Sequence, residues 1–245
     1  MFMATEKKRT KPQESETKSS FDGAQRNPIY ERIMNAIAEH RLHPGTKLAE
    51  DRLASIFGVS RTVVRGVLQQ LSHELVVTIV PNRGAFIASP TVDEARELFE
   101  ARHQIELPVV EKVCRCATKK DIARLRSHVA QEQDARRRED RRAAVRLSGE
   151  FHVLLAQIGG NRFIERTMRG LQMLTCLTIL LYNAPIAQAC PHDEHERLTD
   201  AVEAGDAKLA RKLMVEHLQH IEATLCLNAA GEDDDDLEAI LLQPL

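Results

Sequence analysis

The chain has 245 residues, of which 43% are hydrophobic and 29% charged, and this is enough for two soluble globular domains. No apolar run approaches the roughly 20 residues that a membrane-spanning helix needs, and the polar start lacks the apolar segment of a secretory signal. Five irregularly spaced cysteines argue against a disulfide framework and for a reducing compartment. We therefore expect a cytoplasmic protein without membrane contact.

The net charge of −2 is unevenly distributed. Residues 1–90 contain 13 Lys and Arg against 9 Asp and Glu, whereas the rest of the chain contains 21 against 27. A basic front and an acidic rear are compatible with a nucleic-acid-binding unit joined to a unit with another partner. The imbalance alone does not decide this, because it is common in proteins that never contact DNA.

The first ordered segment is predicted to begin at Asn27. Residues 1–26 are rich in Lys, Ser, Thr, Glu and Gln, and we expect a disordered arm there. In the following NPIYERIMNAIAEH, Asn27 suits an N-cap, Pro28 suits the first helical position, and isoleucines recur at helical spacing. These features predict the first helix of a domain that covers residues 27–90.

Two further helices, separated by a glycine turn, are predicted in KLAEDRLASIFGVSRTVVRGVLQQL. Gly58 is placed to end the first in the left-handed conformation, and Ser60 is placed to cap the second. The outward face of the second helix carries Arg61, Thr62 and Arg65. This pattern is typical of a helix-turn-helix whose second helix enters the major groove of DNA. A solvated arginine face on an amphipathic helix is the alternative.

A β-hairpin is predicted in LVVTIVPNRGAFIASP, with strands at 76–80 and 85–88 flanking the turn PNRG. Arg83 lies at its tip, from where it can contact phosphate or the minor groove. The three helices and this hairpin together predict a winged helix-turn-helix.

From residue 91 onward the apolar pattern is purely helical, and it predicts an all-α antiparallel bundle over residues 91–230. Residues 231–245 carry an acidic run and are predicted to be a solvated tail. The fold class is therefore mainly α. The predicted helices of the bundle lie near 92–116 (with a kink at Pro108), 119–139, 140–158, 162–182, 192–204 and 206–228.

Three histidines occupy apolar helical faces in the predicted bundle, namely His152, His195 and His217. A single histidine in such a place is more often a core residue than a ligand. Three on separate helices of one bundle can instead form a facial site for Zn²⁺, Ni²⁺ or a similar ion, with open positions for an exogenous ligand. Core packing and a divalent transition-metal site both remain open at this point.

The front of the chain resembles the winged helix-turn-helix of the GntR family of bacterial transcription regulators. The resemblance covers residues 28–88 and rests on LHPGTKLAEDRLASIFGVSRTVVRGVLQQLSHELVVTIVPNRGAFI. Three departures are visible: Val63 replaces the usual proline, Gly66 replaces a glutamate, and Glu74 stands where a turn glycine is common. The resemblance implies DNA contacts at Ser60, Arg61, Thr62, Arg65, Asn82, Arg83 and Gly84.

The rear, roughly residues 92–228, resembles the FCD effector-binding domain of the FadR subgroup through LFEARHQIE, EFHVLLAQIGGN, DEHERLTDAVEAGD and ARKLMVEHLQH. Metal-binding members have these three histidines plus an aspartate four residues before the first, where this chain has Ser148. The resemblance also implies that Arg102 meets an acidic effector, in a site that includes Ser148 and His152. A surface salt bridge between Arg102 and Glu106 is the alternative.

Together these features predict a homodimeric, ligand-responsive transcription regulator that binds a palindromic operator. Repression relieved by the ligand is common in similar proteins, so the resemblance further implies a repressor. Its effector is expected to be a small carboxylate. One alternative keeps the DNA-binding role but has a metal-independent apolar or acyl-type effector, bound near His152, Leu155 and Met173. A metal-dependent hydrolase is a remote alternative, because Ser148 and the misplaced Glu150 provide no general base beside the histidines.

Overall fold

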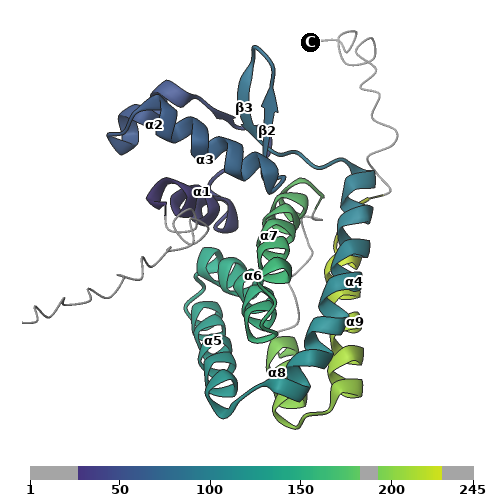
Figure 1. The fold of residues 1–245 in the computed structure, drawn as a ribbon. Helices are drawn as coiled ribbons and strands as arrows, with labels where there is room; N and C mark the ends of the chain where they lie inside the picture. The colour runs from purple at the N-terminus through teal and green to yellow at the C-terminus, as the bar shows by residue number, and fades with distance from the viewer. Residues whose placement is uncertain (1–26, 183–192, 228–245) are drawn as a thin grey trace, which may run out of the picture.

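Residues 27–182 and 193–227 are described in the computed structural model, and they form two units (Figure 1). The predicted arm at 1–26 and the predicted acidic tail at 231–245 lie outside these residues. The winged-helix head comprises residues 28–87, and the helical bundle begins at Val92. Within the described ranges, no helix is long and apolar enough to cross a membrane.

The head is built on three helices whose ends follow the predicted caps. The Asn27 side chain accepts a hydrogen bond from the Ile29 amide at 2.9 Å, and Ser60 accepts one from the Val63 amide at 3.4 Å. Gly58 ends the second helix with φ of 65°, the left-handed conformation that glycine adopts without a steric penalty. The helices are α1 (Pro28–Ala38), α2 (Glu50–Phe57) and α3 (Arg61–His73).

The wing is an antiparallel hairpin of β2 (Val77–Val80) and β3 (Gly84–Ile87). A third strand, β1 (Lys47–Leu48), pairs with β3, so the order in the sheet is β1-β3-β2. The hairpin confirms the predicted wing. Strand β1 was not predicted, because two residues are too few to show an alternating pattern.

The turn after α3 places its left-handed residue one position later than expected. Glu74 has φ of −93°, an ordinary value, whereas Leu75 has φ of 62° and an exposed side chain. The position that suits glycine is therefore Leu75, and the prediction that Glu74 replaces a turn glycine was wrong by one residue. Glu74 instead accepts a hydrogen bond from the Tyr30 hydroxyl at 2.5 Å.

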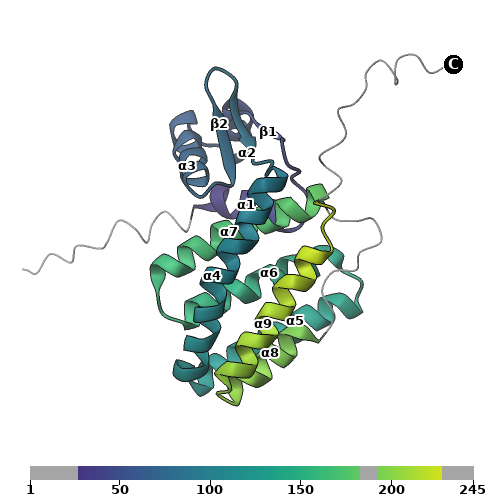
Figure 2. The same cartoon turned by 90° about the vertical axis from the view of Figure 1, so that its right-hand side faces the viewer.

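Between residues 92 and 227, the described part of the bundle contains six helices, which agrees with the predicted number and, to within a few residues, with the predicted boundaries. The first helix begins with a capping box between Thr91 and Glu94 and continues through Pro108. It packs along the last helix (Figure 2). The helices are α4 (Val92–Cys116), α5 (Lys119–Arg137), α6 (Arg141–Ile158), α7 (Arg162–Tyr182), α8 (Glu194–Glu203) and α9 (Ala207–Ala223).

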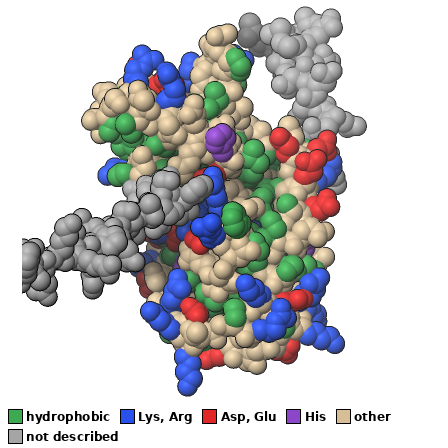
Figure 3. Space-filling model, viewed as in Figure 1, with side chains coloured by type: hydrophobic (Ala, Val, Ile, Leu, Met, Phe, Trp, Pro, Cys, Tyr) green, Lys and Arg blue, Asp and Glu red, His purple; other side chains and the backbone are tan. Residues whose placement is uncertain are grey.

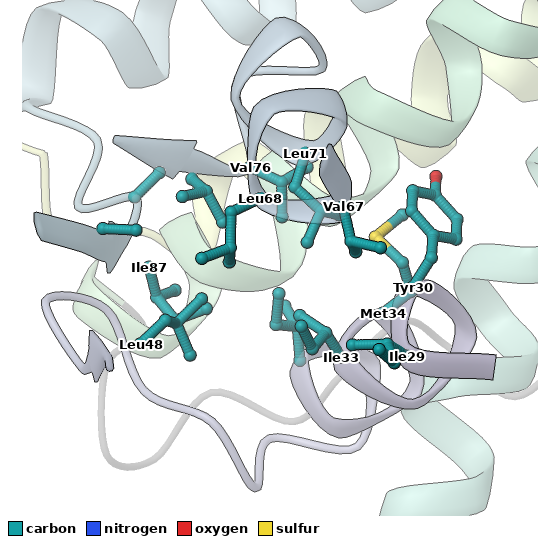
Figure 4. Packing of buried hydrophobic residues seen from close by; sticks show 14 of the residues in the cluster. Ile29, Tyr30, Ile33, Met34, Leu48, Val67, Leu68, Leu71, Val76 and Ile87 are labelled. Carbon is teal, nitrogen blue, oxygen red and sulfur yellow. The ribbon is translucent and has the colours of Figure 1, made fainter. Parts of the chain in front are cut away.

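Helix α7 belongs to both units. The core of the head gathers side chains of α1, α3 and the strands (Figure 4), and Cys176 and Leu177 of α7 are buried in the same cluster. Gly170 brings the α7 backbone against the end of α3, since a Cβ at this position would lie 3.0 Å from the Glu74 carbonyl oxygen. The head and the bundle are therefore joined by a shared hydrophobic core as well as by the chain.

Gly66 lies exposed in the middle of α3 with open space where a side chain would be, and nothing in the structure explains it. Gly66→Ala should raise the free energy of unfolding by about 0.5–1 kcal/mol, because alanine loses less backbone entropy in a helix. Chemical denaturation measures this. The same change at Gly58, which also has free space but a left-handed φ, is the control and should destabilise the protein by about 1 kcal/mol. A destabilising Gly66→Ala would contradict the expectation.

Candidate metal centre and nucleic-acid interface

The three histidines predicted as ligands converge in the interior of the bundle. His152 comes from α6, His195 from α8 and His217 from α9, and all three are buried. The Nε2 atom of His217 lies 3.0 Å from that of His152 and 3.4 Å from that of His195. One ligand atom from each ring lies within 4.8 Å of the others. The prediction that these rings share one site is thus confirmed for their positions.

A glutamate holds the other nitrogen, Nδ1, of each ring. An ionised carboxylate only accepts hydrogen bonds, so each Nδ1 carries the proton and each Nε2 keeps its lone pair. The three lone pairs are consequently directed toward one another, which is the arrangement of second-shell carboxylates around metal-binding histidines. The pairs are His152 with Glu106 at 2.5 Å, His195 with Glu132 at 2.7 Å and His217 with Glu194 at 2.7 Å.

The electrostatics of the site agree with neutral rings and ionised carboxylates at neutral pH. Burial, reinforced by the two neighbouring imidazoles, lowers the pKa of His217 to about 3, and burial also lowers the pKa of His152. Burial would raise the pKa of Glu132 and Glu194, but hydrogen bonds from the histidines lower each to about 2. Neutral imidazole is the form that binds a metal ion.

The donor set fits a divalent transition metal. An ion about 2.0–2.1 Å from each histidine nitrogen holds neighbouring ligand nitrogens roughly 3 Å apart, close to the 3.0 and 3.4 Å of the two pairs that include His217. Because each ring carries its proton on Nδ1, the three Nε2 lone pairs repel one another unless a cation lies between them. Three imidazoles suit Zn²⁺ and Ni²⁺ better than Ca²⁺ or Mg²⁺, which prefer oxygen.

Two more side chains complete the surroundings of the rings. Phe151 stacks on His195 with ring centroids 4.2 Å apart, and His220 shares Glu194 with His217. None of the three glutamates was predicted as a partner of the histidines. Each lies on a helix other than that of its histidine, and no local spacing reveals such a pairing.

Arg102 is fully buried beside this centre, which corrects the alternative of a surface salt bridge. Its Nε donates to Glu106 at 2.6 Å and its Nη1 donates to Thr175 of α7 at 3.3 Å. Its Nη2 has no hydrogen-bond partner among the described residues. A buried guanidinium nitrogen without a partner is costly, and it is a natural donor to an anionic ligand.

Ser148 lies one turn before His152 on α6 and is half-buried. Glu106 does not take the place of a carboxylate ligand there, because one of its oxygens accepts from Arg102 and the other from His152. The centre therefore offers three imidazoles and no carboxylate in the position of Ser148.

The residues named for an apolar effector do not line one pocket. His152 and Leu155 are buried in the interior of the bundle, and Leu155 belongs to its main hydrophobic cluster. Met173 packs against the core of the head. The prediction that these three residues line one apolar effector pocket was wrong, because the Met173 side chain packs against the head.

All seven residues predicted to contact DNA are exposed on the head, at the start of α3 or in the wing. Figure 3 shows basic side chains over α2 and α3 with an acidic side chain among them. Arg65 forms a two-pronged ion pair with Glu50 of α2, with distances of 2.7 and 3.1 Å, and Arg61 pairs with Asp51 at 3.0 Å. The acidic partners Glu50 and Asp51 were not predicted from the sequence.

Comparison with known families now identifies the chain. Residues 25–87 match the model described as bacterial regulatory proteins of the gntR family, and residues 97–220 match the FCD domain. The chain belongs to the GntR family, in the FadR-like group that carries an FCD domain. It is a DNA-binding transcriptional regulator with an FCD effector domain.

The relatives agree with this assignment. The chain is 27% identical to a putative L-lactate dehydrogenase operon regulatory protein of Escherichia coli over 80% of this chain and 84% of that protein. It is 23% identical to the transcriptional repressor RspR of E. coli over 80% and 87%. A putative GntR regulator from Rhodococcus has the same fold, with a TM-score of 0.70, 23% identity and coverage of 85% and 99%. These families and relatives are transcriptional regulators and not enzymes.

The buried Arg102–Glu106 pair should be far more important for stability than a surface pair. Glu106→Ala is expected to destabilise the protein by about 3–5 kcal/mol, because it leaves the Arg102 charge buried with too few partners. Glu203→Ala, which removes a partner of the exposed Arg126, is the control and should cost less than about 1 kcal/mol. Similar losses for the two variants in chemical denaturation would show that Arg102 is not desolvated as described.

Proposed function

We propose that this regulator is a repressor that binds a palindromic operator as a homodimer and responds to a small carboxylate held at a metal centre in the bundle. The exposed start of α3 and the exposed wing support the DNA-binding part. A helix of this kind reads bases through the N-terminal part that enters the major groove, while a wing contacts the backbone or minor groove. Two-fold symmetric heads suit half-sites about one helical turn apart. A regulator of this kind acts in the cytoplasm.

Arg61, Thr62 and Arg65 are the proposed base-reading residues, with Ser60 at the helix cap and Asn82, Arg83 and Gly84 in the wing. Arginine donates two parallel hydrogen bonds to guanine. Arg65 already forms such a two-pronged contact with Glu50, so it must exchange or share that partner when it meets a base. The intramolecular pair holds the guanidinium extended at the surface where DNA would lie.

Arg65→Ala should weaken operator binding by about 1–3 kcal/mol and relax specificity at one base pair. The measurement is fluorescence anisotropy with a duplex that the full-length protein selects from a random library, together with a second selection by the variant. Arg138→Ala, at an exposed arginine just past the end of α5 in the bundle, is the control and should leave both properties unchanged. Unchanged affinity and specificity in Arg65→Ala would remove this residue from the interface.

We assign the metal site to His152, His195 and His217 and expect Zn²⁺ or Ni²⁺. The single observation that carries this assignment is the convergence of three buried Nε2 lone pairs, each ring being held by a glutamate at Nδ1. A bound ion would supply a positive centre for an anionic ligand. Ser148 is a weaker ligand than an aspartate, so this site has one negative charge fewer than its metal-binding relatives have and retains more affinity for an anion.

A carboxylate effector is proposed because Arg102 offers an unpartnered, fully buried Nη2 beside the centre. A carboxylate oxygen accepting from this nitrogen would make a charge-assisted hydrogen bond in a dry environment. Thr178, one turn along α7 from the partner of Arg102, also has a buried hydroxyl with no partner among the described residues, and it suits a ligand hydroxyl. The effector class is therefore a small carboxylic acid with a further polar group.

Binding or release of such a ligand can change the position of the head through α7. Thr175 of this helix accepts from Arg102, and the next two residues, Cys176 and Leu177, lie in the core of the head. An effector that binds two placements of α7 unequally shifts their populations and hence the affinity for DNA.

Ser148→Asp should tighten binding of Zn²⁺ about tenfold or more, because a carboxylate is restored one turn before His152. Metal analysis after dialysis against graded chelator measures the affinity, and Ser127→Asp at an exposed position of α5 is the control. Wild-type protein that binds no Zn²⁺ and gains no thermal stability from it would contradict the site. A Ser148→Asp variant that loses stability without gaining affinity would show that this position does not face the ion.

A further inference from the structure

We propose that the protein has a second small-molecule site, a cleft between the head and the bundle that takes a primary carboxamide with an apolar body. The cleft has a volume of about 280 Å³. One wall is α1 of the head, and the others are α5, α6 and α7 of the bundle. None of its lining residues belongs to the three-histidine centre, so this proposal does not depend on the metal or on the carboxylate effector.

The polar groups of the cleft lack partners of the kind that folded proteins normally provide. Gln172 of α7 is only 6% exposed, yet its Oε1 has no hydrogen-bond partner among the described residues. The same is true of Nε of Arg169, which lies one turn earlier on the same helix. Buried polar groups are nearly always satisfied, so two orphans that line one cleft point to a ligand.

A third group, His128 of α5, adds to this pattern. Its Nε2 lies 2.7 Å from the Leu147 carbonyl oxygen, to which it can only donate, and in the tautomer that makes this bond Nδ1 is an acceptor. Gln172 and His128 thus offer the cleft two acceptors, and Arg169 offers it one donor. A primary carboxamide carries the complement, namely two N–H donors and one carbonyl acceptor.

The remaining lining is mixed: Glu31, Asn35, Glu150 and Gln157 are polar, and the apolar members suit the body of the ligand. Met34 and Ala38 of α1 face the cleft from the head, and Val153, Leu154 and Met173 face it from the bundle. Gly149 of α6 leaves room for the Gln172 amide, since a Cβ at this position would overlap that amide. A ligand seated here touches both units at once, so its binding would favour one placement of the head on the bundle.

Benzamide is the test ligand, and methyl benzoate is its matched partner of similar shape without N–H donors. The six methionines of the full-length chain are labelled at their methyl groups for NMR. Met34 and Met173 report on the cleft, while Met214, buried in the core of the bundle, reports on the interior near the histidines. We expect benzamide to shift the Met34 and Met173 signals saturably, and methyl benzoate to bind about 3- to 10-fold more weakly, as the loss of one or two hydrogen bonds implies.

In the Gln172→Leu variant, benzamide should lose its advantage over methyl benzoate. Gln131→Leu, the same change at an exposed position of α5, should keep it. Equal responses to the two compounds in the wild-type protein would overturn the proposal, and so would a shift confined to Met214. An advantage of benzamide that survives in Gln172→Leu would also overturn it. The comparison of the two compounds in the wild-type protein decides the matter even if Gln172→Leu fails to fold.

Discussion

Helix α7 is packed into the hydrophobic core of the head and is also hydrogen-bonded inside the bundle, so it ties the two units together. One side of α7 places Cys176 and Leu177 among the buried residues of the head, and another side gives Thr175 to Arg102 in the bundle. Burying a leucine side chain stabilises a fold by about 1.5–3 kcal/mol, so the head cannot leave α7 without losing several such contributions. A displacement of α7 by the bundle must therefore move the head or strain their common core, because packed interiors do not deform continuously.

The second constraint is the charge arrangement around the three histidines. Each ring is fixed in one tautomer by a buried glutamate, and two of these glutamates are themselves held by arginines, Glu106 by Arg102 and Glu132 by Arg136. Buried charges are tolerated only when they are paired and hydrogen-bonded, and each of these glutamates is paired with an arginine as well as a histidine. The glutamates also make the ligand nitrogens more basic, which strengthens their hold on a cation.

Much of the fold could be predicted because its signals are local. The caps at Asn27 and Ser60, the left-handed Gly58, and the six helices of the bundle follow from side-chain chemistry and apolar spacing within a few residues. The three histidines could be selected because each lies on an apolar helical face. That they converge was a hypothesis, since one sequence does not say how helices are rotated against each other.

What the sequence did not reveal depends on contacts between distant segments. The partners Glu106 and Glu132 lie 46 and 63 residues from their histidines, and strand β1 is defined only by its pairing with β3. The left-handed turn residue after α3 is Leu75, next to Glu74, which contacts Tyr30 of α1 and lies against Gly170 of α7. The role of α7 in the head could not be seen either, because its apolar pattern is that of any amphipathic helix.

Hydrogen–deuterium exchange of the full-length protein, without and with saturating Zn²⁺, tests the coupling between centre and head most directly. If α7 links the two units, Zn²⁺ should slow amide exchange in α6, α8 and α9, which carry the histidines, and also in α7 and in α1 of the head. Protection confined to α6, α8 and α9, with α7 and α1 exchanging as before, would contradict the account.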